Sequence, residues 1–282
     1  MNEINLIDET IDINLTLTYH LSIQLLQDGF SFSILDTVRN KYIAIKHFNI
    51  AQKSETLTDK FQQVIDSDEL LQKNFKSVYV MCGFSKCTQV PAPLFDVSKI
   101  SSIFNFMHEK EDDEELLYNK LNISGTYLIY SIKKIYLDLI SKQFPNAKFF
   151  HYSLPIIENK MMLYKNKQQQ KVFVNINKSS FDIMVIDCNK MLLFNTYAID
   201  NDDDFIYFFL YVFEQLALNP EEVEVIFMGN TKKDDSYFQK ARKYIRNLKF
   251  DKYDDYYTYS YVFYELPAYI YSNFLNLHKC VS

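Results

Sequence analysis

The feature that most constrains this chain is an internal repeat, in which one order of expected elements occurs twice at an offset of about 150 residues. Each copy has a tight hairpin, a third strand, a helix and a short buried strand that ends on glycine. The expected elements of the first copy are strands at 17–27, 30–36, 42–48 and 77–82 and a helix over 55–75. Those of the second are strands at 171–176, 180–187, 191–197 and 223–228 and a helix over 202–218. A register that holds over five elements favours a duplication; the alternative is two unrelated lobes that share a common motif.

Two βββαβ units, each followed by further helices, predict an α/β protein with mixed sheets in two lobes. We expect a first lobe at 1–168, which includes an inserted α/β segment near 91–152, and a second lobe at 169–282. Further expected elements are helices at 98–106, 133–143, 155–165, 235–248 and 267–277 and strands at 126–132 and 147–151.

Glycine is scarce, with only four residues in a chain of 282. Average usage of about 7% would give roughly 20. Sites that wrap several backbone amides around phosphate need such residues, because their turns require positive φ or close backbone approach. No G-x-G-x-x-G and no G-x-x-x-x-G-K-[ST] occurs, which excludes the dinucleotide and P-loop fingerprints.

The charge balance bears on partners and location. The net charge is −6, which argues against nucleic acid or an anionic membrane as a constant partner. The apolar run at 205–213 is about half the length of a membrane span, so no span is expected. Four cysteines do not make a disulfide framework, and the first residues lack a secretory signal pattern. We therefore expect a cytoplasmic protein.

Three stretches carry a resemblance to known proteins: 21–36 (LSIQLLQDGFSFSILD), 144–152 (FPNAKFFHY) and 172–187 (VFVNINKSSFDIMVID). They resemble an uncharacterised bacterial family with an actin-like fold, and the duplicated plan is similar to that of the actin-like ATPase superfamily. The resemblance implies two RNase H-like βββαβα lobes and no established activity.

The superfamily's chemistry implies specific positions for nucleotide binding. Each phosphate loop lies in the first hairpin of a lobe and reads roughly D-x-G-x-[ST]. The first turn here is Asp28-Gly29-Phe30-Ser31, where a bulky Phe is inserted. The second has Asn where Asp is expected and no glycine, and Asn cannot supply a carboxylate to Mg²⁺. The implied residues of this degenerate nucleotide cleft are Asp28, Gly29, Ser31, Asn175, Asn177, Ser179, Asp182, Gly229 and Asn230.

Several other groups of residues admit a functional or a structural interpretation. Cys82-x₄-Cys87 is half of a zinc motif with no second pair nearby, so Cys82 is expected to be a buried strand residue. Three histidines on apolar strands are expected in the core: His20, His47 and His151. Four carboxylates could cluster between the lobes or cap strand ends, and we favour capping: Asp28, Asp36, Asp182 and Asp187.

Two surface features could contact a partner. Tyr257, Tyr259 and Tyr261 alternate and would stand on one face of a strand, which makes them our best candidate for a partner-binding edge. A basic helix face could bind nucleic acid, although a solvated face is the default: Lys240, Arg242, Lys243 and Arg246.

From these observations we expect a non-catalytic scaffold or adaptor that acts through protein contacts, with no catalytic residue and no metal. No cofactor is expected, while weak binding of ATP and Mg²⁺ is left open. The alternative is an atypical ATPase or kinase that uses the interlobe cleft with Asp28, Asp182 and Gly229. The basic helix as a nucleic-acid binder is a third, weaker hypothesis.

Overall fold

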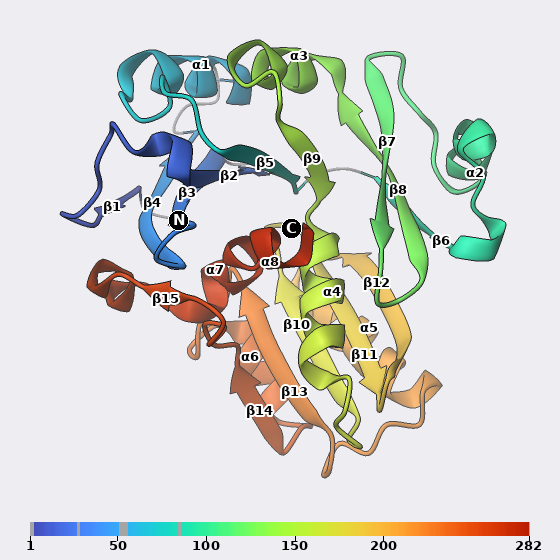
Figure 1. The fold of residues 1–282 in the computed structure, drawn as a ribbon. Coiled ribbons are helices and arrows are strands. Elements are labelled where there is room, and N and C mark those ends of the chain that lie inside the picture. The colour runs from blue at the N-terminus through green and yellow to red at the C-terminus, as the bar shows by residue number, and fades with distance from the viewer. Residues whose placement is uncertain (1–2, 27–28, 51–55, 84–85, 282) are drawn as a thin grey trace. The chain divides into compact units, whose positions relative to one another are not determined.

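A computed structural model describes residues 3–26, 29–50, 56–83 and 86–281 (Figure 1). The chain divides into two compact units. Unit 1 comprises Met1–Leu154, Asp255–Leu266 and Leu277–Ser282, and unit 2 comprises Pro155–Asp254 and Pro267–Asn276. The first boundary thus follows Leu154, whereas we expected it after residue 168, and the chain also returns to unit 1 twice near its C-terminus. No helix in the described ranges has both the length and the apolar character that a bilayer crossing requires.

The main sheet of unit 1 is mixed, in the order β1-β4-β3-β2-β5-β9, with β15 also paired to β4. β3 lies between β2 and β4 and pairs antiparallel with both, whereas β5 pairs parallel with β2 and β9 pairs parallel with β5. The strands are β1 (Ile4–Ile7), β2 (Tyr19–Leu26), β3 (Gly29–Asp36), β4 (Lys41–Asn49), β5 (Ser77–Cys82), β9 (Lys148–His151) and β15 (Thr258–Tyr259).

Helices α1 (Leu57–Ser67) and α3 (Lys134–Gln143) lie side by side on one face of this sheet (Figure 1). A capping box begins α1, because the Thr56 and Asp59 side chains each accept from the other's backbone N–H. The apolar positions of α1 then fall on one face, where Phe61 packs into the core of the sheet. The short helix α8 (Leu277–Val281) contacts β5.

A smaller three-stranded sheet, in the order β6-β8-β7, lies in the chain between β5 and α3. Its members are β6 (Cys87–Pro91), β7 (Glu114–Leu121) and β8 (Thr126–Lys133), with 3-10 turns at Ala92–Leu94 and Val97–Lys99 and helix α2 (Ile100–Met107). Val90, Phe104 and Ile129 form its own apolar cluster. This insertion therefore occupies 87–133, whereas α3 and β9 belong to the main layers of unit 1.

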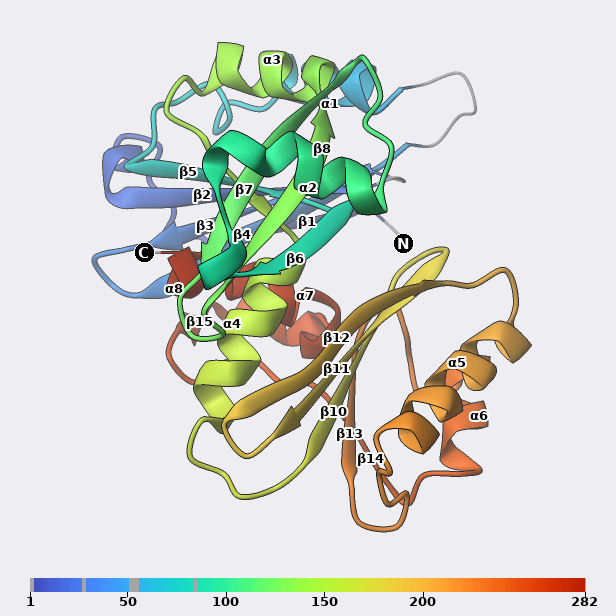
Figure 2. The ribbon, with the colours of Figure 1, turned by 90° about the vertical axis from the view of Figure 1, so that its right-hand side faces the viewer.

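Unit 2 contains a five-stranded sheet in the order β12-β11-β10-β13-β14. Helices α5 and α6 cover one face (Figure 2), and α7 and the part of α4 from Pro155 cover the other. The strands are β10 (Lys171–Ile176), β11 (Ser180–Asp187), β12 (Lys190–Ala198), β13 (Glu224–Gly229) and β14 (Asn247–Phe250). The helices are α4 (Ser153–Tyr164), α5 (Asp202–Gln215), α6 (Ser236–Arg242) and α7 (Ala268–Leu275).

The two units repeat one topology, which confirms the predicted α/β class. The order β4-β3-β2-β5-β9 in unit 1 corresponds strand by strand to β12-β11-β10-β13-β14 in unit 2. The match extends to an irregularity, since the hairpin register shifts between Ile34 and Leu35 in one unit and between Val185 and Ile186 in the other. A capping box also begins the helix after the third strand in both units. A shared bulge and a shared cap support duplication of one ancestral unit.

The structure corrects the expected elements at the C-terminal end. The helix expected over 235–248 ends at Arg242, and the chain then forms β14, which pairs parallel with β13. The expected tyrosine strand is reduced to two residues, Thr258–Tyr259, followed by a 3-10 turn over Tyr261–Glu265. Strands β1, β6 and β7 were not expected from the sequence.

Candidate functional site

The second phosphate-type turn joins β10 to β11 in unit 2. Its backbone closes where the Asn177 N–H donates to the Ser180 carbonyl oxygen at 2.9 Å. Lys178 and Ser179 occupy the tip and are exposed. The Ser179 carbonyl accepts from the Ile199 N–H at 3.0 Å, so the turn is tied to the segment that follows β12. The tip therefore presents one lysine and one serine side chain to solvent.

Asp182 lies directly beneath this turn and is 1% exposed. Its Oδ2 accepts from the Asn175 Nδ2 at 2.8 Å and from the Asn177 Nδ2 at 3.1 Å. Its Oδ1 accepts from the Thr196 hydroxyl at 2.7 Å. The buried carboxylate is thus held by one side chain each from β10, the β10–β11 turn and β12, and both oxygens already have donors. This arrangement locks the hairpin.

Gly229 ends β13 beside the same turn, with φ at +83°. A Cβ at this position would collide with the Ile176 carbonyl oxygen and lie 2.6 Å from the Asn175 Oδ1. The next residue, Asn230, donates its N–H to that Ile176 carbonyl at 2.7 Å. Only glycine permits this close passage of the chain. Asn175, Asn177, Asp182, Gly229 and Asn230 are therefore brought together in one place.

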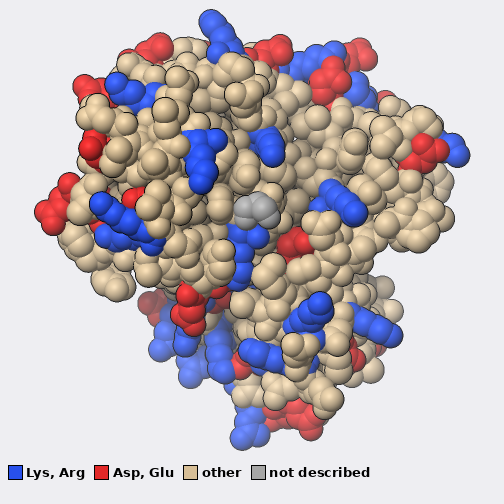
Figure 3. Space-filling view, viewed as in Figure 1, with Lys and Arg blue, Asp and Glu red and all other residues tan. Residues whose placement is uncertain are grey.

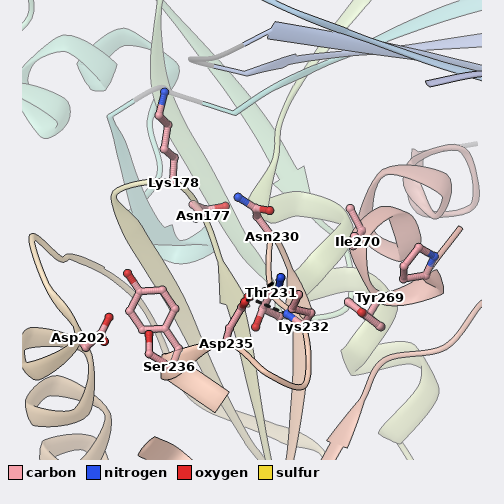
Figure 4. Close-up of a pocket in the computed structure, with 12 residues that line it drawn as sticks. Asn177, Lys178, Asp202, Asn230, Thr231, Lys232, Asp235, Ser236, Tyr269 and Ile270 are labelled. Atoms are coloured by element: carbon pink, nitrogen blue, oxygen red, sulfur yellow. Dashed lines mark hydrogen bonds and ion pairs between the residues drawn. The ribbon is translucent and has the colours of Figure 1, made fainter. Parts of the chain in front are cut away.

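A pocket of about 660 Å³ opens next to this cluster (Figure 4). It lies wholly within unit 2 and draws on the β10–β11 turn, the start of α5, the β13–α6 loop and the start of α7. The residues that line it are Asn177, Lys178, Asp202, Asn230, Thr231, Lys232, Asp235, Ser236, Tyr237, Pro267, Tyr269 and Ile270. Its lining combines amides, hydroxyls and two lysines with aromatic rings, a composition that suits a small polar ligand.

The Thr231 hydroxyl is the unusual group in this pocket. The residue is 4% exposed, and its Oγ1 has no hydrogen-bond partner among the described residues. Such buried orphan groups are uncommon in folded proteins. Beside it, Asp235 is engaged, because its carboxylate accepts from the Lys232 N–H at 2.8 Å. Burial, with Asp202 and Asp235 nearby, raises the pKa of the Tyr237 phenol.

The first phosphate-type turn belongs to unit 1, and its Asp28 lies outside the described residues. A Cβ at Gly29 would collide with the carbonyl oxygen of Phe48. Phe30 is fully buried, and its ring centroid is 4.9 Å from those of both Phe48 and Phe61. Ser31 is also fully buried and hydrogen-bonds the His47 Nδ1 at 2.9 Å. Phe30 and Ser31 are therefore part of the core of unit 1, and neither side chain is accessible to a ligand.

The other titratable candidates are structural. Asp36 caps a turn by accepting from the Val38 and Arg39 N–H groups, and Asp187 accepts from the Gln170 side chain. The predicted core histidines are buried, each bonded to a serine hydroxyl: His20 to Ser77, His47 to Ser31 and His151 to Ser153.

Cysteine chemistry is disfavoured at the half zinc motif, since burial raises the pKa of the Cys82 thiol to about 12. In the described part of the chain, no three His, Cys, Asp or Glu residues are placed to hold a metal ion.

The prediction that Tyr257, Tyr259 and Tyr261 form a partner-binding face is wrong. Tyr257 is buried, and Tyr259 stacks on the Tyr42 ring at 5.7 Å within unit 1, so only Tyr261 is exposed. Pairing of β15 with β4 explains this, because it turns these rings toward the sheet.

The basic helix face is partly neutralised. Lys240 donates to Asp203 at 2.6 Å, and Arg246 lies 3.5 Å from Glu221. Acidic and basic side chains also occur on both units in the face drawn in Figure 3.

Sequence reasoning missed several residues of the site. Thr196 lies directly opposite Asp182, but only because the register shifts between Val185 and Ile186; an uninterrupted hairpin would place Asn195 there, so the sequence does not reveal this contact. Thr231 and Lys232 follow the predicted Gly229-Asn230 pair but carry no motif of their own. Tyr269 and Ile270 come from a helix about 40 residues later in the chain, a placement that only tertiary structure reveals.

Comparison of the sequence with known proteins identifies the family of this chain. The sequence profile of the family described as "Protein of unknown function (DUF3822)" matches residues 8–248. The chain therefore belongs to that family. No curated protein matches the sequence.

Solved structures extend the comparison. A Bacteroides thetaiotaomicron protein with an actin-like ATPase fold and unknown function is 27% identical, with a TM-score of 0.77. The match covers 86% of this chain and 94% of that one. A chain of the PilM–PilN type IV pilus biogenesis complex has a TM-score of 0.58 at 9% identity, covering 93% of this chain and 98% of that one. The chain thus has the actin-like ATPase fold, as the resemblance implied.

Proposed function

We propose that this family member is a protein-interaction scaffold with an actin-like fold and no phosphoryl-transfer chemistry. The observation that carries the proposal is the state of Asp182. Its two oxygens accept from Asn175, Asn177 and Thr196, and the residue is almost fully buried. A buried carboxylate with three side-chain donors stabilises the fold. We also propose, as expected from the sequence, that the protein is cytoplasmic.

The chemistry of phosphoryl transfer explains why this matters. Mg²⁺ keeps several waters and needs an accessible carboxylate or phosphate oxygen in octahedral geometry. A catalytic base or water-positioning group must likewise face the nucleophile. At the positions where a carboxylate would be needed, this turn has the amide side chains of Asn175 and Asn177, and both amides donate to Asp182. The second turn therefore presents no accessible carboxylate oxygen to a metal ion or a nucleophile.

A protein partner is supported by analogy of fold. The solved PilM–PilN type IV pilus biogenesis complex contains a chain with a similar fold, at a TM-score of 0.58. Fold similarity at 9% identity does not transfer the partner, but the occurrence of this fold in a protein complex supports a protein partner for this chain.

Isothermal titration of the full chain with ATP and with ADP, each with and without Mg²⁺, tests the proposal together with a phosphate-release assay. We expect no Mg²⁺-dependent heat at sub-millimolar ligand and no phosphate release. Sub-millimolar binding accompanied by turnover would overturn the scaffold proposal. The Asp182→Asn variant serves as control, because a trace contaminant ATPase would persist in it unchanged.

The pocket favours a second candidate function, which is binding of a small polar ligand without hydrolysis. Its basis is the unpartnered Thr231 hydroxyl, with Lys178 and Lys232 on the same lining. Lys178 favours an anionic group beside the β10–β11 turn, whereas Lys232 lies 4.0 Å from Asp235 and Asp202 adds a further negative charge. The lining therefore suits a polar ligand that carries both donors and acceptors, and weak nucleotide binding falls within this class. Titration with ATP, ADP and inorganic phosphate should show weak heat that Thr231→Val reduces. Lys243→Ala, on a residue outside the pocket, should leave that heat unchanged; equal loss in both variants counts against the pocket.

A further inference from the structure

Two histidine side chains meet where helix α8 packs on the main sheet of unit 1. His278 of α8 lies against His20 of β2, with ring centroids 4.5 Å apart. Both rings also contact Tyr79 of β5, at centroid distances of 4.2 Å for His20 and 5.9 Å for His278. The His278 Nδ1 lies 3.3 Å from the Tyr257 hydroxyl, which comes from the segment before β15. His20 is fully buried and His278 is half-buried, so this ring pair is part of the contact between α8 and the sheet.

The surroundings of this pair favour uncharged imidazoles. The two ring nitrogens of His20 are hydrogen-bonded to serine hydroxyls, to Ser77 at 2.7 Å and to Ser22 at 3.0 Å. Among the described residues neither histidine contacts a carboxylate, and the charged side chain that acts on both rings is that of Lys76. A proton on either ring would therefore lie beside a second imidazole and a lysine, with no negative charge to offset it.

The other titratable groups on the elements that meet here are phenols, a thiol and lysines: Tyr79, Tyr257, Cys280, Lys148 and Lys279. Burial raises the pKa of the Tyr79 phenol above its ordinary value, so this group stays neutral. The Lys148 ammonium of β9 lies 5.9 Å from the centre of the same ring. Lowering the pH therefore adds positive charge to a cluster that contains neutral and cationic groups.

We propose that α8 stays on the sheet of unit 1 only while His20 and His278 are uncharged, so that acid releases this helix from an otherwise folded unit. At neutral pH the two rings pack against each other and against Tyr79. In acid the rings gain protons and repel each other. The residues of α8, 277–281, then leave the sheet, and the surface formed by His20 and Tyr79 is uncovered.

Proton binding gives the direction of the effect. Burial lowers the pKa of His20 well below its ordinary 6.5, and repulsion from His278 and Lys76 lowers it further. Burial and Lys76 also lower the pKa of His278. When α8 leaves, the pKa of each ring rises toward its ordinary value, so release takes up protons and becomes more favourable as the pH falls below 6.5. The equilibrium constant for release rises at most about tenfold per pH unit for each imidazole.

A nitroxide spin label on α8 measures the release in the full chain. Val281→Cys carries the label in a background where Cys87, Cys188 and Cys280 are changed to Ser, and Cys82 is fully buried. The nitroxide itself does not titrate, so its spectrum reports the mobility of α8 at every pH. We expect an immobilised label at about pH 7.5. The ratio of mobile to immobilised label should rise about tenfold or more by about pH 5, while the far-UV circular dichroism stays unchanged.

Matched variants separate the charge of the rings from their packing. His20→Gln and His278→Gln should each reduce the pH dependence of the label, whereas His108→Gln, at a histidine bonded to the Cys87 carbonyl in the insertion, should leave it unchanged. Lys76→Glu keeps both histidines and places a carboxylate near them, so it should move the release to lower pH. Lys73→Glu makes the same charge change at an exposed lysine that does not act on either ring, and it should leave the release pH unchanged.

Three results would overturn the proposal. The first is a label that stays immobilised down to about pH 5. The second is a release that occurs with the same pH dependence in both histidine variants or that Lys76→Glu does not move. The third is loss of the far-UV signal at the pH where the label becomes mobile, because the change would then be unfolding of the whole chain and no separate release of α8.

Discussion

Replacing Asp182 with Ala should destabilise unit 2 strongly, because this carboxylate holds the β10–β11 hairpin. Three side-chain donors lose their acceptor: the Asn175 and Asn177 amides at 2.8 and 3.1 Å and the Thr196 hydroxyl at 2.7 Å. A hydrogen bond to a charged group contributes about 1.5–3 kcal/mol. Desolvation of the carboxylate offsets part of that sum, so we expect a loss of about 3–5 kcal/mol in the free energy of unfolding.

Urea unfolding followed by far-UV circular dichroism measures this loss, since the chain has no Trp for fluorescence. Asp187→Ala is the matched control, because Asp187 is half-buried at the end of the same strand and accepts from Gln170 at 3.3 Å. The control should lose less than about 1 kcal/mol. Equal stability of the two variants would refute the structural role assigned to Asp182, and loss of an ATPase activity in Asp182→Ala would assign it a catalytic one.

Further predictions concern backbone, pH and packing. Gly229→Ala should lower the free energy of unfolding by about 2–4 kcal/mol in urea titrations, because φ is positive and the added Cβ would collide with the end of β10. Gly125→Ala is the control: its φ is also positive but its surroundings are open, so it should lower that free energy by about 1 kcal/mol. Burial, with further repulsion from His278, holds the pKa of His20 well below its ordinary 6.5. The free energy of unfolding should therefore be fully present above pH 6.5 and fall as pH drops below it, by at most about 1.4 kcal/mol per pH unit for this group, and a flat profile from pH 8 to 5 contradicts a buried neutral imidazole. Phe30→Ala should cost about 3–5 kcal/mol by leaving a cavity in the core of unit 1, and calorimetry that finds an unchanged unfolding temperature would count against its burial.

Much of the fold could be predicted because both units carry strong local signals. Alternating or continuous apolar runs separated by short turns define the hairpins, and β3 and β11 end at Asp36 and Asp187 as expected. The strands that were missed are short or polar. β14 spans only Asn247–Phe250, and its apolar residues continue the helical spacing of α6, so periodicity alone extends the helix. Pairing with β13 decides its conformation.

The candidate site was predictable only in part. The fold resemblance located the turn residues and Gly229, and the structure brings Asn175, Asn177 and Asp182 together. The sequence does not reveal that both amides donate to Asp182, because this depends on the side-chain rotamers and on Thr196 of the next strand, which donates to the other carboxylate oxygen. Burial of the tyrosines at 257 and 259 likewise follows from long-range pairing of β15 with β4, which no local pattern indicates.

The most direct test of the central claim is phosphate release by the purified full chain in the presence of ATP and Mg²⁺. We predict no release above that of the Asp182→Asn variant, since the Asp182 carboxylate beneath the β10–β11 turn already accepts from Asn175, Asn177 and Thr196. Turnover that is present in the wild type and abolished in a folded Asp182→Asn variant would contradict the account.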